Sequence, residues 1–293
     1  MIVTGADDDY VRIWNVTTHV NLRSVQGGDD IRAVAFSNDG MYVAAGMDDD
    51  TIDIYYASNL TSVHGSISVD VGSGDQVNSV EFSPDSSLVA VAIGRSGNGG
   101  TNGEVKLIKV SDGLQLGNGI NPNGEDRFYD AAFSPNGQFI ALAGNGDFFI
   151  VNITSRATIT SIGDPQASVN AIAWSPDGNM LALCEGWGGQ QSGSRGVRLT
   201  MYNYVTGTSP WYHKTTTSCL STEFSPDGRQ VAAGVQWYST DGGKTFVLDT
   251  NTGAVRATLG SSCNTCPEIN DVEWSSNAQY ILTGVTNNGN SNA

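Results

Sequence analysis

The chain has 293 residues, of which 39% are hydrophobic, a length and composition typical of one large all-β domain with a substantial core. Its 30 acidic and 14 basic residues give a formal net charge of −16. Such a surface repels phosphate backbones and anionic headgroups, and no apolar run reaches the about 18 residues that a membrane-spanning helix needs. We therefore expect neither a nucleic-acid partner nor membrane insertion.

The sequence opens on an apolar run, residues 1–4, which is followed by Gly5 and an aspartate triplet. Apolar residues then alternate again over residues 11–14. This pattern predicts the second and third strands of a repeated unit, with no first strand before them. At the other end, residues 271–275 and 280–284 predict a first and a second strand. Both ends of the chain are thus expected to form partial units.

One phrase recurs six times along the chain: an alternating strand, a tight Ser-Pro-Asp-Gly-like turn and a small apolar strand. Its aromatic anchors are Phe36, Phe82, Phe133, Trp174, Phe224 and Trp274. A third strand and a weaker fourth follow each phrase, so the repeat is roughly 40–50 residues long. Within each unit the apolar period is two, which excludes helical repeats.

Four antiparallel strands per unit, repeated along the chain, predict an all-β fold, a β-propeller of four-stranded antiparallel blades. We expect one propeller domain over residues 1–293. It would have partial blades at 1–25 and 270–285 and complete blades anchored at residues 36, 82, 133, 174 and 224. Two blade counts fit the spacing: a six-bladed ring with overlapping ends, or a seven-bladed or larger ring with its ends missing, and the second is preferred.

The units resemble WD repeats over essentially the whole chain, most closely at residues 4–15 and 45–56. The resemblance implies that Asp8 and Asp49 brace the turn between the second and third strands. It also implies a non-enzymatic scaffold that holds other proteins in a larger assembly, with a cytoplasmic location. The sequence departs from the family in lacking the Gly-His pair, and the terminal Trp-Asp appears only as Trp14-Asn15.

Long loops after the second strands of several units are the expected binding face, because binding residues concentrate on loops held by a rigid scaffold. Trp187, Arg195, Trp237 and Tyr238 lie in or beside these loops, off the alternating core pattern. Aromatic residues and arginine are common interface anchors, so we expect these four to contact a partner protein. The alternative is that they fold back as lids over the ends of the blades.

No residue set predicts catalysis, a metal or a cofactor. Cys263 and Cys266 have the spacing of a redox motif or half a zinc site, but no second Cys or His pair completes it. A local disulfide or two inert thiols is the expected state. The three histidines fall in different units, and no nucleophile-elbow motif is present. The aspartate triplets do not match a calcium loop and are expected to brace turns. We expect no enzymatic activity.

Three glycosylation sequons begin at Asn15, Asn59 and Asn152. Together with the low charged content of 15%, they favour a secreted protein. An alternative function is therefore an extracellular surface or ligand-binding propeller, lectin-like or part of a structural assembly. A third hypothesis is a propeller module of a hydrolase.

Overall fold

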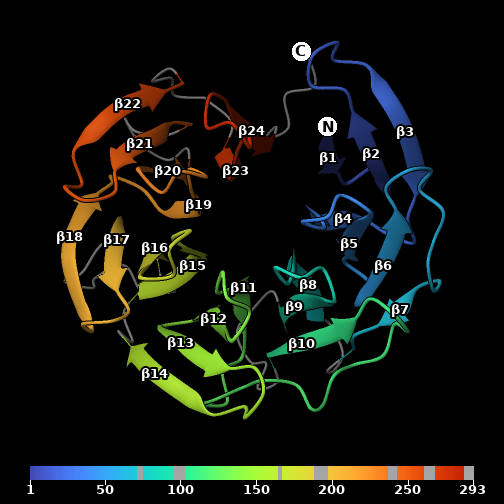
Figure 1. Ribbon diagram of the computed structural model, residues 1–293, viewed down its shortest axis with the longest axis horizontal. Helices are drawn as coiled ribbons and strands as arrows, with labels where there is room; N and C mark the ends of the chain where they lie inside the picture. Colours follow the sequence, from blue (N-terminus) through green and yellow to red (C-terminus); the bar gives the residue numbers. More distant parts are fainter. Residues whose placement is uncertain are drawn as a thin grey trace. The chain divides into compact units, whose positions relative to one another are not determined.

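The computed structural model describes residues 1–70, 75–95, 103–163, 167–187, 197–236, 243–260 and 268–286 (Figure 1). All regular structure in these ranges is β-strand, and none of their segments is a helix able to cross a membrane. The chain divides into two compact units, Met1–Gly144 with Phe149–Thr160, and Asn145–Phe148 with Ser161–Ala293.

Three sheets lie entirely within the first unit, and every strand pair in them is antiparallel. They are formed by β1 (Ile2–Gly5), β2 (Tyr10–Trp14) and β3 (Asn21–Gln26); by β4 (Ile31–Phe36), β5 (Tyr42–Met47), β6 (Thr51–Tyr56) and β7 (Ile67–Ser68); and by β8 (Asp75–Phe82), β9 (Leu88–Arg95) and β10 (Glu104–Lys109).

A further four-stranded sheet has residues in both units. Its strands are β11 (Phe128–Phe133), β12 (Phe139–Gly144), β13 (Asp147–Asn152) and β14 (Thr158–Gly163).

Three sheets lie entirely within the second unit. They are formed by β15 (Ala167–Trp174), β16 (Met180–Trp187), β17 (Arg198–Asn203) and β18 (Thr208–Lys214); by β19 (Cys219–Phe224), β20 (Gln230–Val235), β21 (Thr245–Asp249) and β22 (Val255–Leu259); and by β23 (Glu268–Trp274) and β24 (Ile281–Thr286).

Within every sheet the strands are neighbours in sequence order, as Figure 1 shows for β15 to β18. This confirms the predicted all-β repeat: the described part of the chain forms seven antiparallel sheets of two to four strands, consistent with the blades of a WD40 β-propeller. That the whole chain is one domain stays a prediction.

The turn between the first and second strands is held by its own polar side chains. In the β4–β5 turn, Ser37 Oγ donates to Asp39 Oδ1 at 2.6 Å, and the Tyr42 nitrogen donates to Ser37 Oγ at 2.8 Å. Gly40 has a φ of 70°, which a residue with a Cβ rarely adopts. The hydrogen bond from Ser37 lowers the pKa of Asp39. Because each repeat carries this local turn chemistry, the hairpins could be predicted from the sequence.

The second strands form the core, and one glycine sets how closely the next sheet approaches. Val43, Ala44 and Ala45 on β5 are fully buried. A Cβ atom on Gly46 would lie 2.2 Å from Cγ1 of Val77 on β8. The close approach of β5 to β8 therefore requires glycine at this position.

Candidate functional site

The partner-binding residues expected from the sequence lie mostly outside the described residues. Arg195, Trp237 and Tyr238 fall there, as do Cys263 and Cys266. Trp187 is the last residue of β16, and only its backbone is described. The role of these residues stays a prediction.

The β16–β17 hairpin carries the predicted Trp187–Arg195 loop. At the end of the hairpin next to this loop lies an ion pair that was not predicted from the sequence. Glu185 and Arg198 are opposite each other in the strand register. Arg198 Nε and Nη2 donate to the two carboxylate oxygens of Glu185, with Nη2 at 3.2 Å from Oε1. The side chain of Arg198 is only 12% exposed and that of Glu185 only 10%. This is a bidentate ion pair shielded from solvent, the geometry in which arginine binds a carboxylate most strongly.

Two further contacts hold the ion pair. The buried Thr200 donates from Oγ1 to Glu185 Oε1 at 3.2 Å. The Arg198 guanidinium carbon lies 5.2 Å from the centre of the Tyr212 ring, within cation–π distance. Residues on β17 and β18 therefore hold the ion pair in its orientation.

A pocket of about 220 Å³ opens beside this pair, inside the second unit. Glu185, Arg198 and Thr200 line one part of it. Phe148 and Tyr202 line another part, with their rings edge to face at 5.2 Å. Burial is the main cause that raises the pKa of Tyr202, and the nearby Tyr204 raises it further. The phenol of Tyr202 therefore stays protonated at neutral pH. The pocket thus combines hydrogen-bonding groups with aromatic surface.

The signal that could have found this site is a departure from the repeat. The positions equivalent to Glu185 in the β5, β9 and β20 strands are the apolar Met47, Ile93 and Val235. A carboxylate there must lose most of its hydration, which costs free energy unless it is paired.

A disulfide that was not predicted joins two sheets of the second unit. Cys184 on β16 and Cys219 on β19 are bonded across a sequence separation of 35, and both are fully buried. From the sequence, a local disulfide is expected only between the closely spaced Cys263 and Cys266. Because a disulfide needs its two Cα atoms close together in space, a pair so far apart in sequence is recognised only from the fold.

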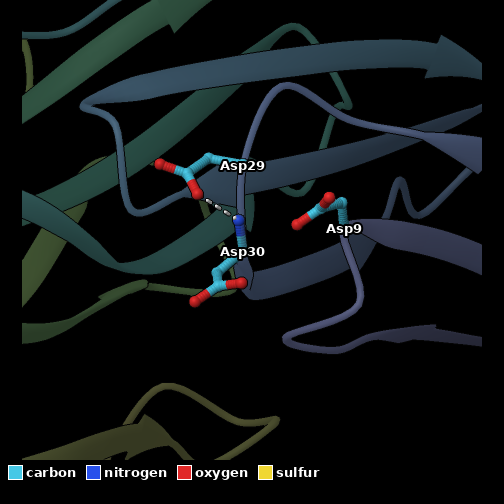
Figure 2. Close-up of side chains that lie close together, drawn as sticks. All are labelled: Asp9, Asp29 and Asp30. Carbon is cyan, nitrogen blue, oxygen red and sulfur yellow. Dashed lines mark hydrogen bonds between the residues drawn. The ribbon is translucent and has the colours of Figure 1, made fainter.

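Three carboxylates of the first unit come together at the ends of β2 and β4. Oxygens of Asp9, Asp29 and Asp30 all lie within 4.8 Å of one another, and the Asp30 nitrogen donates to Asp29 Oδ1 at 2.9 Å (Figure 2). Partial burial and then the carboxylate of Asp7 raise the pKa of Asp30. Each residue offers one carboxylate oxygen to this cluster, three in all, which is fewer than the six to eight that calcium takes. The arrangement by itself is an acidic surface.

Asp8 and Asp49 occupy turns between second and third strands. Asp8 Oδ1 accepts from the Tyr10 nitrogen at 3.2 Å, and its carboxylate pairs with Arg12 at 2.6 Å. Asp49 Oδ1 accepts from Thr51 Oγ1 at 2.6 Å. Each aspartate thus binds the strand that follows it.

The three sequon asparagines share one turn geometry. The side-chain oxygens of Asn15, Asn59 and Asn152 each accept the main-chain N–H of the threonine two residues later, at 2.9 to 3.1 Å. These are Asx turns, a structural reason for Asn-x-Thr at the end of a third strand. The amide nitrogen, the atom that glycosylation modifies, takes no part in this bond. Whether it is glycosylated stays a prediction.

Three segments of the chain match the family described as WD domain, G-beta repeat: residues 20–55, 65–108 and 157–190. Each segment begins at the last strand of one sheet (β3, β7 or β14) and continues through the first and second strands of the next sheet. WD repeats are thus detected at these three segments, which support a WD-repeat assignment for the parts of the chain they cover. WD repeats generally mediate protein–protein interactions as scaffolds, and propellers of this family are typically non-enzymatic.

Proposed function

We propose that this protein is a non-enzymatic scaffold that binds other proteins within a larger assembly. The observation that carries the proposal is the match of three segments to WD repeats, in a chain whose described part is built of antiparallel sheets with buried second strands. Such sheets form a rigid support, and the loops that connect them are free to differ in sequence. The partner surface we propose contains Trp187, Arg195, Trp237 and Tyr238.

Charge suggests the kind of partner segment. The net charge of −16 and the acidic surface of Asp9, Asp29 and Asp30 favour basic segments and accelerate their association. Binding that depends on this attraction weakens as the salt concentration rises.

The proposal is tested by cross-linking the purified protein to proteins from its natural source and mapping the cross-links by mass spectrometry. We expect cross-links to residues 187–196 and 236–243, and their loss in the double variant Trp187→Ala with Trp237→Ala. Tyr280→Ala is the matched control, because this aromatic side chain is 67% exposed in a turn between first and second strands. A partner that binds both variants equally would contradict the proposed surface.

A second candidate function is an extracellular surface or ligand-binding propeller, which the Cys184–Cys219 disulfide favours. Structural disulfides persist mainly in oxidising compartments. The intact mass of the protein from its natural source, before and after reduction and enzymatic deglycosylation, tests this candidate. We expect a mass increase on reduction and alkylation and a loss of glycan mass from Asn15, Asn59 or Asn152. Free thiols and unmodified asparagines would contradict it.

A further inference from the structure

One face of β17 lines the pocket of the second unit along its length. Arg198, Thr200 and Tyr202 are alternate residues of this strand, so their side chains point to the same side, and all three line the pocket. Four residues of a strand rise about 13 Å, so the pocket has two separate ends. Arg198 with its partner Glu185 forms a polar end, and Tyr202 with Phe148 forms an aromatic end.

The ion pair at the polar end is not a requirement of the repeat. The equivalent second-strand positions carry Met47, Ile93 and Val235, so an apolar side chain satisfies the fold there. Replacing a buried ion pair by apolar residues is often neutral or stabilising, so stability alone does not account for the pair. A role in binding accounts for it, because the arginine of the pair lines a pocket.

The polar end has a hydrogen-bond donor that the protein does not use. The Glu185 carboxylate is engaged by Arg198, by Thr200 and by a further interaction, so we assign no ligand contact to it. Arg198 uses Nε and Nη2 for Glu185, whereas its Nη1 group forms no hydrogen bond with the described residues. Guanidinium N–H groups only donate, so the ligand group that fits beside Nη1 is an acceptor.

The charge of the pocket favours a neutral acceptor. The guanidinium charge of Arg198 is already balanced by Glu185, whose side chain is only 10% exposed. A carboxylate or phosphate at Nη1 would lie close to this shielded carboxylate and would approach a chain with a net charge of −16. A carbonyl oxygen accepts a hydrogen bond without bringing a charge. The polar end therefore fits the oxygen of an amide or a ketone.

The remaining lining fits an aromatic ring. Phe148 and Tyr202 are buried with their rings edge to face, and Val169 and Leu183 add aliphatic surface between the two ends. A ligand ring that packs there loses its contact with water and gains the edge-to-face or offset contact that aromatic rings prefer. A cavity of about 150 Å³ holds a benzene molecule, so a pocket of about 220 Å³ holds a ring with a short side chain.

From this geometry we infer that the pocket binds a small neutral molecule with an aromatic ring and a carbonyl acceptor, of the aryl-alkyl amide class. The carbonyl oxygen accepts from Arg198 Nη1, and the ring packs against Phe148 and Tyr202. The inference does not depend on the proposed scaffold function, because it uses no residue of the proposed partner surface.

The test uses 3-phenylpropanamide as the probe and 3-phenylpropanoate as its charged analogue of nearly the same shape. Saturation-transfer NMR detects binding, and titration calorimetry measures Kd. We expect saturable binding of the amide, with Kd in the millimolar range ordinary for a ligand of about 11 non-hydrogen atoms. The carboxylate should bind at least about fivefold more weakly, because it meets the repulsion of Glu185.

A first variant tests the contact with the carbonyl oxygen. Arg198→Lys keeps a positive charge beside Glu185 but removes the Nη1 donor, so Kd for the amide should rise about tenfold. Arg256→Lys is the matched control, because this arginine of the same unit pairs with Asp249 and does not line the pocket. It should leave Kd unchanged.

A second variant fills the pocket. Ser209 lines it and is exposed, so Ser209→Trp adds bulk at the pocket without entering the core and should abolish binding. Thr258→Trp places the same bulk on an exposed residue of β22 outside the lining and should leave binding unchanged. Circular dichroism verifies that each variant is folded, and Ser209→Trp decides the case if Arg198→Lys does not fold.

Absence of saturable binding of the amide would overturn the inference. Tighter binding of the carboxylate than of the amide would overturn it as well, since the site would then select an anion. Equal Kd values for the wild type, Arg198→Lys and Ser209→Trp would place the binding elsewhere on the protein and would also contradict it.

Discussion

The side chain of Glu81 on β8 is hydrogen-bonded to the main chain of Phe133 on β11: a carboxylate oxygen accepts from the Phe133 nitrogen at 2.7 Å. Glu223 on β19 accepts from the nitrogen of Trp274 on β23 in the same way. Each glutamate directly precedes the aromatic anchor of its own repeat, and each acceptor reaches the anchor of the next repeat. The contact thus connects successive sheets by a hydrogen bond from a main-chain nitrogen to a glutamate side chain.

Removing the Glu81 carboxylate should destabilise the protein. Glu81→Ala leaves the Phe133 N–H without this acceptor, and we expect a loss of about 1.5–3 kcal/mol in the free energy of unfolding. Urea denaturation measures it. Glu268→Ala is the control, because the side chain of this half-buried glutamate forms no hydrogen bond with the described residues. An equal effect of both variants would show that the Glu81 contact is not the cause.

The Cys184–Cys219 disulfide should contribute substantially to stability. Closing a loop with a sequence separation of 35 restricts the unfolded chain, which corresponds to about 3–4 kcal/mol in the chain-entropy model. We expect the double variant Cys184→Ala with Cys219→Ala to lose at least this amount in denaturant unfolding. The wild type should approach the variant once it is reduced. Insensitivity of the wild type to reduction would contradict the prediction.

The close approach of β5 to β8 should make Gly46 intolerant of any larger residue. An added Cβ would lie 2.2 Å from Val77 Cγ1, so Gly46→Ala should cost about 1–3 kcal/mol through overpacking. Thermal unfolding followed by calorimetry gives the difference. In the control Gly28→Ala, the nearest contact is Asp49 Oδ2 at 3.3 Å, and this side chain can move. A smaller loss for Gly46→Ala than for Gly28→Ala would disprove the packing argument.

Stability should fall as pH rises through the range in which Glu223 titrates. Burial, and then the neighbouring Glu273 and Asp271 carboxylates, raise the pKa of Glu223 above its ordinary value of 4.5. Between the two values the folded state binds more protons than the unfolded state. Glu223 therefore contributes its full stabilisation to the free energy of unfolding below about pH 4.5, and this stabilisation is lost as pH rises through the raised pKa.

Glu273→Gln tests this pH dependence, because it removes the carboxylate that has the largest charge effect on Glu223 and lets the pKa of Glu223 fall toward its ordinary value. We expect the free energy of unfolding to decrease less steeply with pH in the variant than in the wild type, measured from about pH 5 to about pH 9. Parallel curves would contradict the assigned coupling.

Relieving repulsion in the acidic surface should be stabilising at neutral pH. Asp30→Asn removes one charge beside Asp9 and Asp29, so Tm should rise at low ionic strength, and the rise should shrink in concentrated salt. Asp112→Asn is an informative contrast. It breaks the ion pair between Asp112 and Lys109 at 2.5 Å, so its Tm should fall. The same direction of change in both variants would rule out local repulsion as the cause.

The amino-acid sequence by itself determined the all-β class, the order of strands and the hairpins of the repeat. These features are local: the Ser37–Asp39 turn and the alternation of apolar residues are complete within one repeat. The tertiary structure alone decided which residues meet between sheets. Cys184 is bonded to Cys219 and Glu81 is hydrogen-bonded to Phe133, because separate sheets bring residues that are distant in sequence close together. For the same reason, Glu185 and Arg198 line a pocket. Such partners are set by packing across sheets, which the period of a single strand does not encode.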